Sequence, residues 1–232
     1  KRYMSISRPN DGNFEVGKEL SEKPKFPIED VIQVVRFEEH DEHAESFMWA
    51  IDEMIALDPK MTLTPGKHWG DYQNAPNHEN MQLFKGDNEK GYGHPFSNHY
   101  GEKYSETNRI YEGKFKELLK PYLQRYAEKF YCNIVTINRV WFSRYRLKNG
   151  FGWHTHAGVN MSGVYLLDMP DYCVTEFKID MDIPAKEGDL ILFPSSFIHR
   201  CPPVYEDGKT AIVFSWDMHY LPPEFEKNWK ND

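Results

Sequence analysis

The chain has 232 residues, the size of one large domain, and we expect residues 1–232 to fold as a single unit. Hydrophobic residues make up 40% of the sequence and aromatic residues 15%, which excludes an intrinsically disordered segment. A net charge of −8 argues against a nucleic-acid-binding protein and against docking on an anionic membrane, because both partners select a surplus of lysine and arginine.

The cysteines and the hydropathy pattern indicate a compartment. Three cysteines are present and none is spaced as C-x-x-C: Cys132, Cys173 and Cys201. Reduced thiols are the simplest interpretation. Residues 1–7 lack the apolar core of a signal peptide, and no run of residues is long and apolar enough for a membrane span. We therefore expect a cytoplasmic protein.

The first 130 residues predict helices interrupted by irregular chain. Prolines and glycines make residues 1–40 an irregular arm that could exchange with a neighbour in a homo-oligomer, with a short strand predicted at 31–37. Asp41 is a candidate cap for the next helix, which Pro59 ends. The helix has apolar residues at the spacing of one buried face, namely Phe47, Ala50, Ile51, Met54 and Ile55.

Residues 60–106 show neither helical nor strand periodicity, and glycine, asparagine, histidine and proline are concentrated there. Such a long irregular stretch is typical of a lid, a binding loop or an assembly arm. A second amphipathic helix is predicted at 107–130, where Pro121 should kink or split it. Its predicted buried side consists of Phe115, Leu118, Leu119, Tyr122, Leu123 and Tyr126.

From residue 131 to about 220 the sequence changes to short runs rich in β-branched and aromatic residues, separated by glycine, proline and aspartate. Strands are predicted at 134–146, 162–167, 174–179, 189–193 and 210–216. Helices followed by an all-β half indicate an α+β fold in which the strands form a sandwich or barrel.

Two histidines in this β half are spaced for a common metal ion. His154 and His156 are separated by one residue, and side chains at i and i+2 of a strand leave from the same face. Imidazole is a ligand for iron, zinc, copper and nickel, so the pair does not identify the metal. Two histidines on one strand face also occur without any ion.

A third histidine and a lysine follow the predicted strand at 189–193. His199 comes after a proline in an apolar region, and Lys209 opens the last apolar strand. A jelly roll could bring His199 to the His154 and His156 pair, although a core histidine bonded to a carbonyl is the alternative. An ammonium group directed into a β-barrel requires an anion; the alternative is a surface lysine at the strand end.

Taken together, these residues resemble the Fe(II)- and 2-oxoglutarate-dependent oxygenases, particularly the prolyl-4-hydroxylase-like and the phage or bacterial branches. The resemblance covers about residues 138–217 and depends on Tyr145, Gly150, His154-x-His156, Ser162-Gly-Val-Tyr165, Gly188-Asp-x-x-x-Phe193-Pro194, His199 and Lys209. It implies a double-stranded β-helix (jelly roll) core, with His154 and His199 as ligands of Fe(II). It also implies that Lys209 pairs with the distal carboxylate of 2-oxoglutarate and that Tyr145 lies against this cosubstrate.

The family chemistry would be oxidative decarboxylation of 2-oxoglutarate to succinate, coupled to hydroxylation of a C–H bond. The family pattern is His-x-Asp or His-x-Glu, whereas this chain has His156 at the carboxylate position. Three neutral imidazoles leave Fe(II) with its full charge of +2 and discriminate less against zinc or nickel. Asp168, Asp171 and Glu176 follow the pair, but none has the spacing of the missing carboxylate.

A second resemblance concerns the cupins, which share the double-stranded β-helix. Gly188, Pro194, Ser196 and His199 are similar to the second cupin motif, with serine in place of its glycine. Three functions therefore stay open: a 2-oxoglutarate-dependent oxygenase with the site His154, His156 and His199; a three-histidine cupin-type dioxygenase without 2-oxoglutarate; and a binding or assembly protein without catalysis. In the first, the 60–106 segment is the candidate for covering or selecting an unknown substrate.

Overall fold

The computed structural model describes residues 27–57, 96–97, 111–146, 150–170, 175–179, 183–202, 204 and 209–222. The predicted arm before residue 27 and nearly all of the 60–106 segment lie outside the described residues. Helix α1 (Ile28–Val31) and strand β1 (Gln33–Arg36) therefore begin the described chain, and β1 confirms the strand predicted at 31–37.

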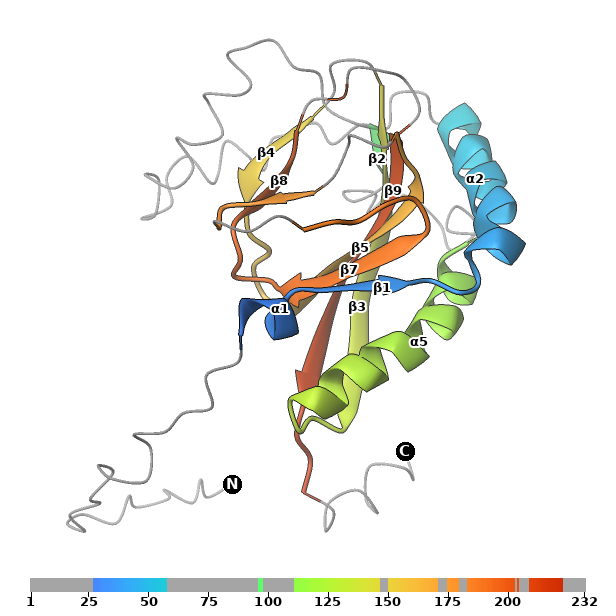
Figure 1. Cartoon of the computed structure of the whole chain (residues 1–232). Coiled ribbons are helices and arrows are strands. Elements are labelled where there is room, and N and C mark those ends of the chain that lie inside the picture. Colours follow the sequence, from blue (N-terminus) through green and yellow to red (C-terminus); the bar gives the residue numbers. More distant parts are fainter. Residues whose placement is uncertain are drawn as a thin grey trace, which may run out of the picture.

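Two antiparallel sheets form the β half. The larger, six-stranded sheet has the order β1-β7-β5-β9-β3-β2, with β2 Phe96–Ser97, β3 Ile134–Tyr145, β5 Met161–Asp168, β7 Asp189–Pro194 and β9 Lys209–His219. The smaller sheet has the order β4-β8-β6, with β4 Phe151–His154, β6 Glu176–Phe177 and β8 His199–Cys201. Figure 1 shows β4 and β8 across from the larger sheet, so the predicted α+β fold with a jelly-roll core is confirmed.

Two long helices cover the other side of the larger sheet, helix α2 (His40–Leu57) and helix α5 (Glu112–Lys129) (Figure 1). The predicted buried face of α2 is confirmed at Phe47, Ala50, Ile51 and Met54. The helix begins at His40, two residues earlier than a cap at Asp41 requires, so Asp41 lies inside its first turn and is not the cap. An acidic side chain there still interacts favourably with the helix dipole.

Of the two effects predicted for Pro121, a kink or a split, the split does not occur, because helix α5 is continuous. Pro121 removes the backbone donor that would bond the carbonyl of Glu117, but both residues are exposed, so water can bond that carbonyl. The opposite side of the helix is buried as predicted, at Phe115, Leu119, Tyr122, Leu123 and Tyr126. Neither α2 nor α5, the long helices of the described chain, is apolar enough to cross a membrane.

The larger sheet separates two apolar clusters. On the helix side, Phe115 stacks on Tyr165 with ring centroids 5.6 Å apart and contacts Phe214. Between the sheets, the cluster includes Leu166, Ile191, Phe193, Val204 and Ala211. Gly163 on β5 allows the packing of Phe214 in the helix-side cluster, because a Cβ atom at position 163 would collide with the Phe214 ring.

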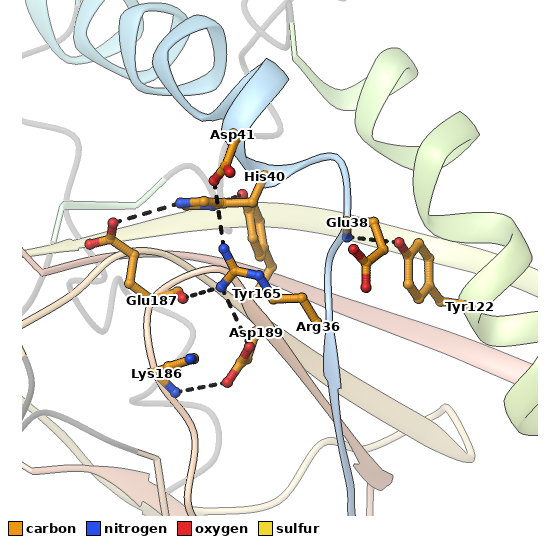
Figure 2. Close-up of polar contacts among 9 residues, drawn as sticks. All are labelled: Arg36, Glu38, His40, Asp41, Tyr122, Tyr165, Lys186, Glu187 and Asp189. Carbon is orange, nitrogen blue, oxygen red and sulfur yellow. Dashed lines mark hydrogen bonds and ion pairs between the residues drawn. The ribbon is translucent and has the colours of Figure 1, made fainter.

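A polar network connects β1 and the start of α2 to the turn before β7 (Figure 2). The Arg36 guanidinium donates to the Glu187 carbonyl at 2.6 Å and lies 3.6 Å from the carboxylates of Asp41 and Asp189. His40 contacts the Tyr165 hydroxyl at 2.7 Å through Nδ1. The network fixes the position of α2 on the sheet on the side remote from the histidines described next.

Candidate metal centre

Three histidines come together between the two sheets. His154 is the last residue of β4 and His199 the first of β8, and the two are paired in register with ring centroids 4.2 Å apart. The His156 ring lies 5.1 Å from that of His154 and 5.0 Å from that of His199. One ring nitrogen from each lies within 4.8 Å of the others. Of the three, His199 is buried and the other two are half-buried.

Backbone carbonyls orient two of the rings. The Nδ1 atom of His154 lies 2.9 Å from the Gly152 carbonyl oxygen, and that of His199 lies 2.9 Å from the Phe197 carbonyl oxygen. A carbonyl oxygen only accepts hydrogen bonds, so each Nδ1 must carry the proton. Each Nε2 atom is left with its lone pair toward the shared centre, which is the arrangement of metal-bound histidines.

His156 reaches the cluster from outside the strand. The sequence predicted His154 and His156 on one regular strand. That prediction is wrong, because strand β4 ends at His154. The backbone N–H of His156 instead donates to the Ser195 carbonyl at 3.0 Å. Its ring packs beside that of Trp141, at 5.6 Å, and its Nε2 lies 3.2 Å from the Nε2 of His154. The rings converge even though the strand ends.

The donor set fits a divalent transition metal. Two nitrogens bound to one ion at about 2.1 Å are separated by about 3.0 Å at a right angle and about 3.4 Å at a tetrahedral angle. The 3.2 Å between the Nε2 atoms of His154 and His156 lies between these values. Burial lowers the pKa of His199 to about 4, against the effect of its bond to the Phe197 carbonyl, so this imidazole is neutral near pH 7, as a ligand must be.

No carboxylate belongs to the cluster within the described chain. Glu176 is engaged elsewhere, because it accepts a hydrogen bond from the Arg200 side chain at 2.6 Å. Asp168 is the last residue of β5 and is not part of the cluster, and Asp171 lies outside the described residues. No acid from another described element therefore supplies the carboxylate ligand that the family pattern places at position 156.

The cluster faces a cavity of about 470 Å³. Strands β3 and β9 provide one wall, as a ladder of residue pairs in register: Tyr145 with Lys209, Ser143 with Ala211, Trp141 with Val213, and Arg139 with Ser215. The two ends of this wall differ in exposure, because Lys209 is 1% exposed and Arg139 lies at the surface. The cavity thus has a deep end at Lys209 and an open end at Arg139.

Lys209 and Tyr145 lie together at the deep end. The Lys209 ammonium donates to the Cys201 thiol at 3.1 Å and lies 5.3 Å from the centroid of the Tyr145 ring. The alternative of a surface lysine is therefore wrong, since Lys209 opens β9 as predicted but points inward. Neither Cys201 nor Cys132 forms a disulfide, and Cys173 lies outside the described residues.

The described residues that line the cavity include Arg139, Arg200 and Lys209 but no aspartate or glutamate. Arg139 is exposed to solvent and also lines the cavity. Arg144 binds Asp52 of α2 at 2.9 Å. Sequence reasoning also missed Cys201, although its position two residues after His199 on a strand places both on one face.

Comparisons with known proteins give solved structures only. No protein-family model and no curated protein matches the chain. A viral collagen prolyl hydroxylase from Paramecium bursaria Chlorella virus-1 is 14% identical, with a TM-score of 0.47, over 89% of this chain and 98% of that one. A Pseudomonas putida prolyl-4-hydroxylase is 10% identical, with a TM-score of 0.44, over 82% and 93%.

An oxidoreductase of the 2OG-Fe(II) oxygenase family from Burkholderia pseudomallei is 18% identical, with a TM-score of 0.38. The match covers 45% of this chain and spans about half of that protein, 55% of its length. These are similarities of fold at low identity.

Proposed function

We propose that the chain is a non-haem iron oxygenase of the 2-oxoglutarate class with a three-histidine metal site. The observation that carries the proposal is the convergence of His154, His156 and His199 at the wall of a cavity whose deep end holds the Lys209 ammonium. The motif spacing described above favours the same class. Three protein ligands leave positions on an ion for cosubstrate and oxygen.

The spacing between the histidines and Lys209 suits 2-oxoglutarate. The Lys209 ammonium contacts Cys201, which lies two residues along β8 from His199, a separation of about 7 Å in a strand. The carboxyl carbons of 2-oxoglutarate are joined by four carbon–carbon bonds and lie about 5 Å apart in the extended form. A cosubstrate whose 2-oxo acid end lies at the histidines would thus place its distal carboxylate at the ammonium.

Electrostatics favour the same orientation. The described cavity wall contains no carboxylate, so nothing in it repels a dianion, and a buried ammonium gains a strong charge-assisted partner. Tyr145 forms an aromatic side to the lysine pocket. Apolar residues such as Val213 and Phe151 line the remaining wall and exclude water from the reacting centre.

Iron would supply the activation of dioxygen, while the chain supplies ligands, orientation and a shielded cavity. His154, His156 and His199 would hold Fe(II), and the carbonyls of Gly152 and Phe197 would keep two of the rings in the required tautomer. Neutral ligands leave the full charge of the ion to attract an anionic cosubstrate. The same donor set accommodates zinc or nickel, so the identity of the metal must be determined by experiment.

Turnover under air tests the proposal. The full chain with Fe(II) and 2-oxoglutarate should release succinate, and the His199→Ala variant should release none. Iron binding without succinate would favour a three-histidine cupin-type dioxygenase, which uses no 2-oxo acid. A chain that binds no metal would favour a binding or assembly protein that retains only the scaffold.

A further inference from the structure

The open end of the cavity carries a second basic group, on strand β3. The register of β3 with β9 shifts between Ile137, opposite Trp216, and Arg139, opposite Ser215, so Asn138 is the extra residue of a β-bulge. The Asn138 amide donates to the Asp217 carboxylate at 2.6 Å, which stabilises the bulge. The bulge therefore has a defined side-chain anchor.

The bulge determines which way Arg139 points. In a regular strand Ile137 and Arg139 would leave from the same face. Here Ile137 packs on the helix-side cluster, whereas Arg139 lines the cavity together with Trp141. Without the extra residue, either an apolar side chain would leave the core or the arginine would leave the cavity.

The Arg139 guanidinium is available to a ligand. Among the described residues, no hydrogen bond or ion pair engages it. The acid nearest along the neighbouring strand, Asp217, accepts bonds from the Asn138 side chain and from the Asn160 backbone N–H at 2.7 Å. Arg200, which also lines the cavity, differs because it is neutralised by Glu176 at 2.6 Å and stacks over Trp153.

From these contacts we infer that the substrate of this cavity is a small organic acid, whose carboxylate binds Arg139 while its apolar body crosses Trp141 toward the histidines. The inference rests on the proposed function, because it assigns Lys209 to the cosubstrate. Arg139 and Trp141 are two residues apart, about 7 Å along the strand, and the Trp141 ring lies 5.6 Å from that of His156. A compact acid can therefore span from the guanidinium to the metal centre.

The chemistry of the wall explains the choice of a carboxylate. A guanidinium binds a carboxylate through two parallel hydrogen bonds, which fixes orientation as well as charge. The indole of Trp141 and the side chains of Val159 and Val213 provide apolar contact for the rest of such a molecule. A neutral amide of the same shape loses the charge-assisted bonds and keeps only the apolar contact.

A matched pair of probes tests the inference without requiring turnover. 3-Phenylpropionate and 3-phenylpropionamide, which differ in charge but little in shape, would be titrated calorimetrically into the full chain loaded with Zn(II). We expect the acid to bind at least about tenfold more tightly than the amide. Arg139→Gln should abolish this preference while leaving the thermal unfolding curve unchanged, because the residue is exposed.

Two control variants locate the preference. Arg200→Gln and Lys209→Met should both retain it, since one removes an arginine already paired and the other alters the deep end. Three results would overturn the inference. They are a preference for the acid that survives Arg139→Gln, loss of that preference in Lys209→Met, and no preference in the wild-type chain. The failure of the proposed function would appear separately, as absence of succinate from 2-oxoglutarate.

Discussion

His154 and His199 are paired directly across β4 and β8, and the centroids of their rings are 4.2 Å apart. Each ring is oriented by a carbonyl two residues before it in the chain, Gly152 for one and Phe197 for the other. The two strands thus form a symmetric support that presents two nitrogen lone pairs to one point, which His156 also reaches from beyond the strand.

This support predicts a stoichiometric metal site. The wild-type chain should bind one Co(II) or Zn(II) per molecule, and His199→Ala should weaken binding by about 100-fold or more, since even supporting residues of metal sites contribute 10- to 100-fold. His219→Ala, at the exposed end of β9, is the matched control and should leave affinity unchanged. Competition with a chromophoric chelator gives the constants, and equal affinity in both variants would refute the site.

Lys209→Met should separate cosubstrate binding from metal binding. Loss of one charge-assisted interaction weakens 2-oxoglutarate binding by about 10- to 100-fold, whereas metal affinity stays constant because the ammonium does not belong to the histidine cluster. Lys178→Met, an exposed lysine near β6, should change neither. Calorimetric titration of the metal into the metal-free chain gives the metal affinity, and titration of 2-oxoglutarate into the metal-loaded chain gives the cosubstrate affinity; unchanged 2-oxoglutarate affinity in Lys209→Met would contradict the assignment.

His156→Asp should reduce iron affinity and succinate formation, even though it restores the family's carboxylate. The carboxylate oxygen lies one bond closer to the backbone than the imidazole Nε2, which makes the close approach to His154 at 3.2 Å. The backbone here is tied to Ser195, so it cannot advance freely. Increased succinate formation in this variant would show instead that the natural histidine marks diverted or lost chemistry.

Two glycine substitutions should affect stability in opposite directions. Gly163→Ala should lower the free energy of unfolding by about 1–3 kcal/mol, the usual cost of overpacking, because its Cβ would collide with Phe214. Gly113→Ala, in the first turns of α5 with open space around it, should raise it by up to about 1 kcal/mol through helix propensity. Urea denaturation compares the two, and a neutral Gly163→Ala would contradict the packing described.

Most elements of the fold could be predicted from local patterns. The buried face of α2 follows from the helical spacing of Phe47 to Met54, and the strands at β3, β5, β7 and β9 follow from their apolar runs. The end of β4 at His154 and the bulge at Asn138 could not be predicted. Both depend on pairing with strands distant in sequence, namely β8 and β9, and not on the residues' own propensities.

In the candidate site, too, some features could be predicted from the sequence and others depend on strand pairing. The spacing of His154, His156 and His199 predicted their meeting, because a jelly roll brings distant strands together around one point. The contact of Lys209 with Cys201 and the direction of Arg139 depend on register. A shift of one residue would move each side chain to the other face of its strand, and no local pattern specifies that register.

The most direct measurement is an anaerobic absorption titration of the Fe(II)-loaded chain with 2-oxoglutarate. If the three histidines hold iron and Lys209 receives the distal carboxylate, a visible charge-transfer band should develop only on adding 2-oxoglutarate and saturate at one equivalent. It should require a higher concentration in Lys209→Met. Iron that remains bound through the whole titration with no band would contradict the account.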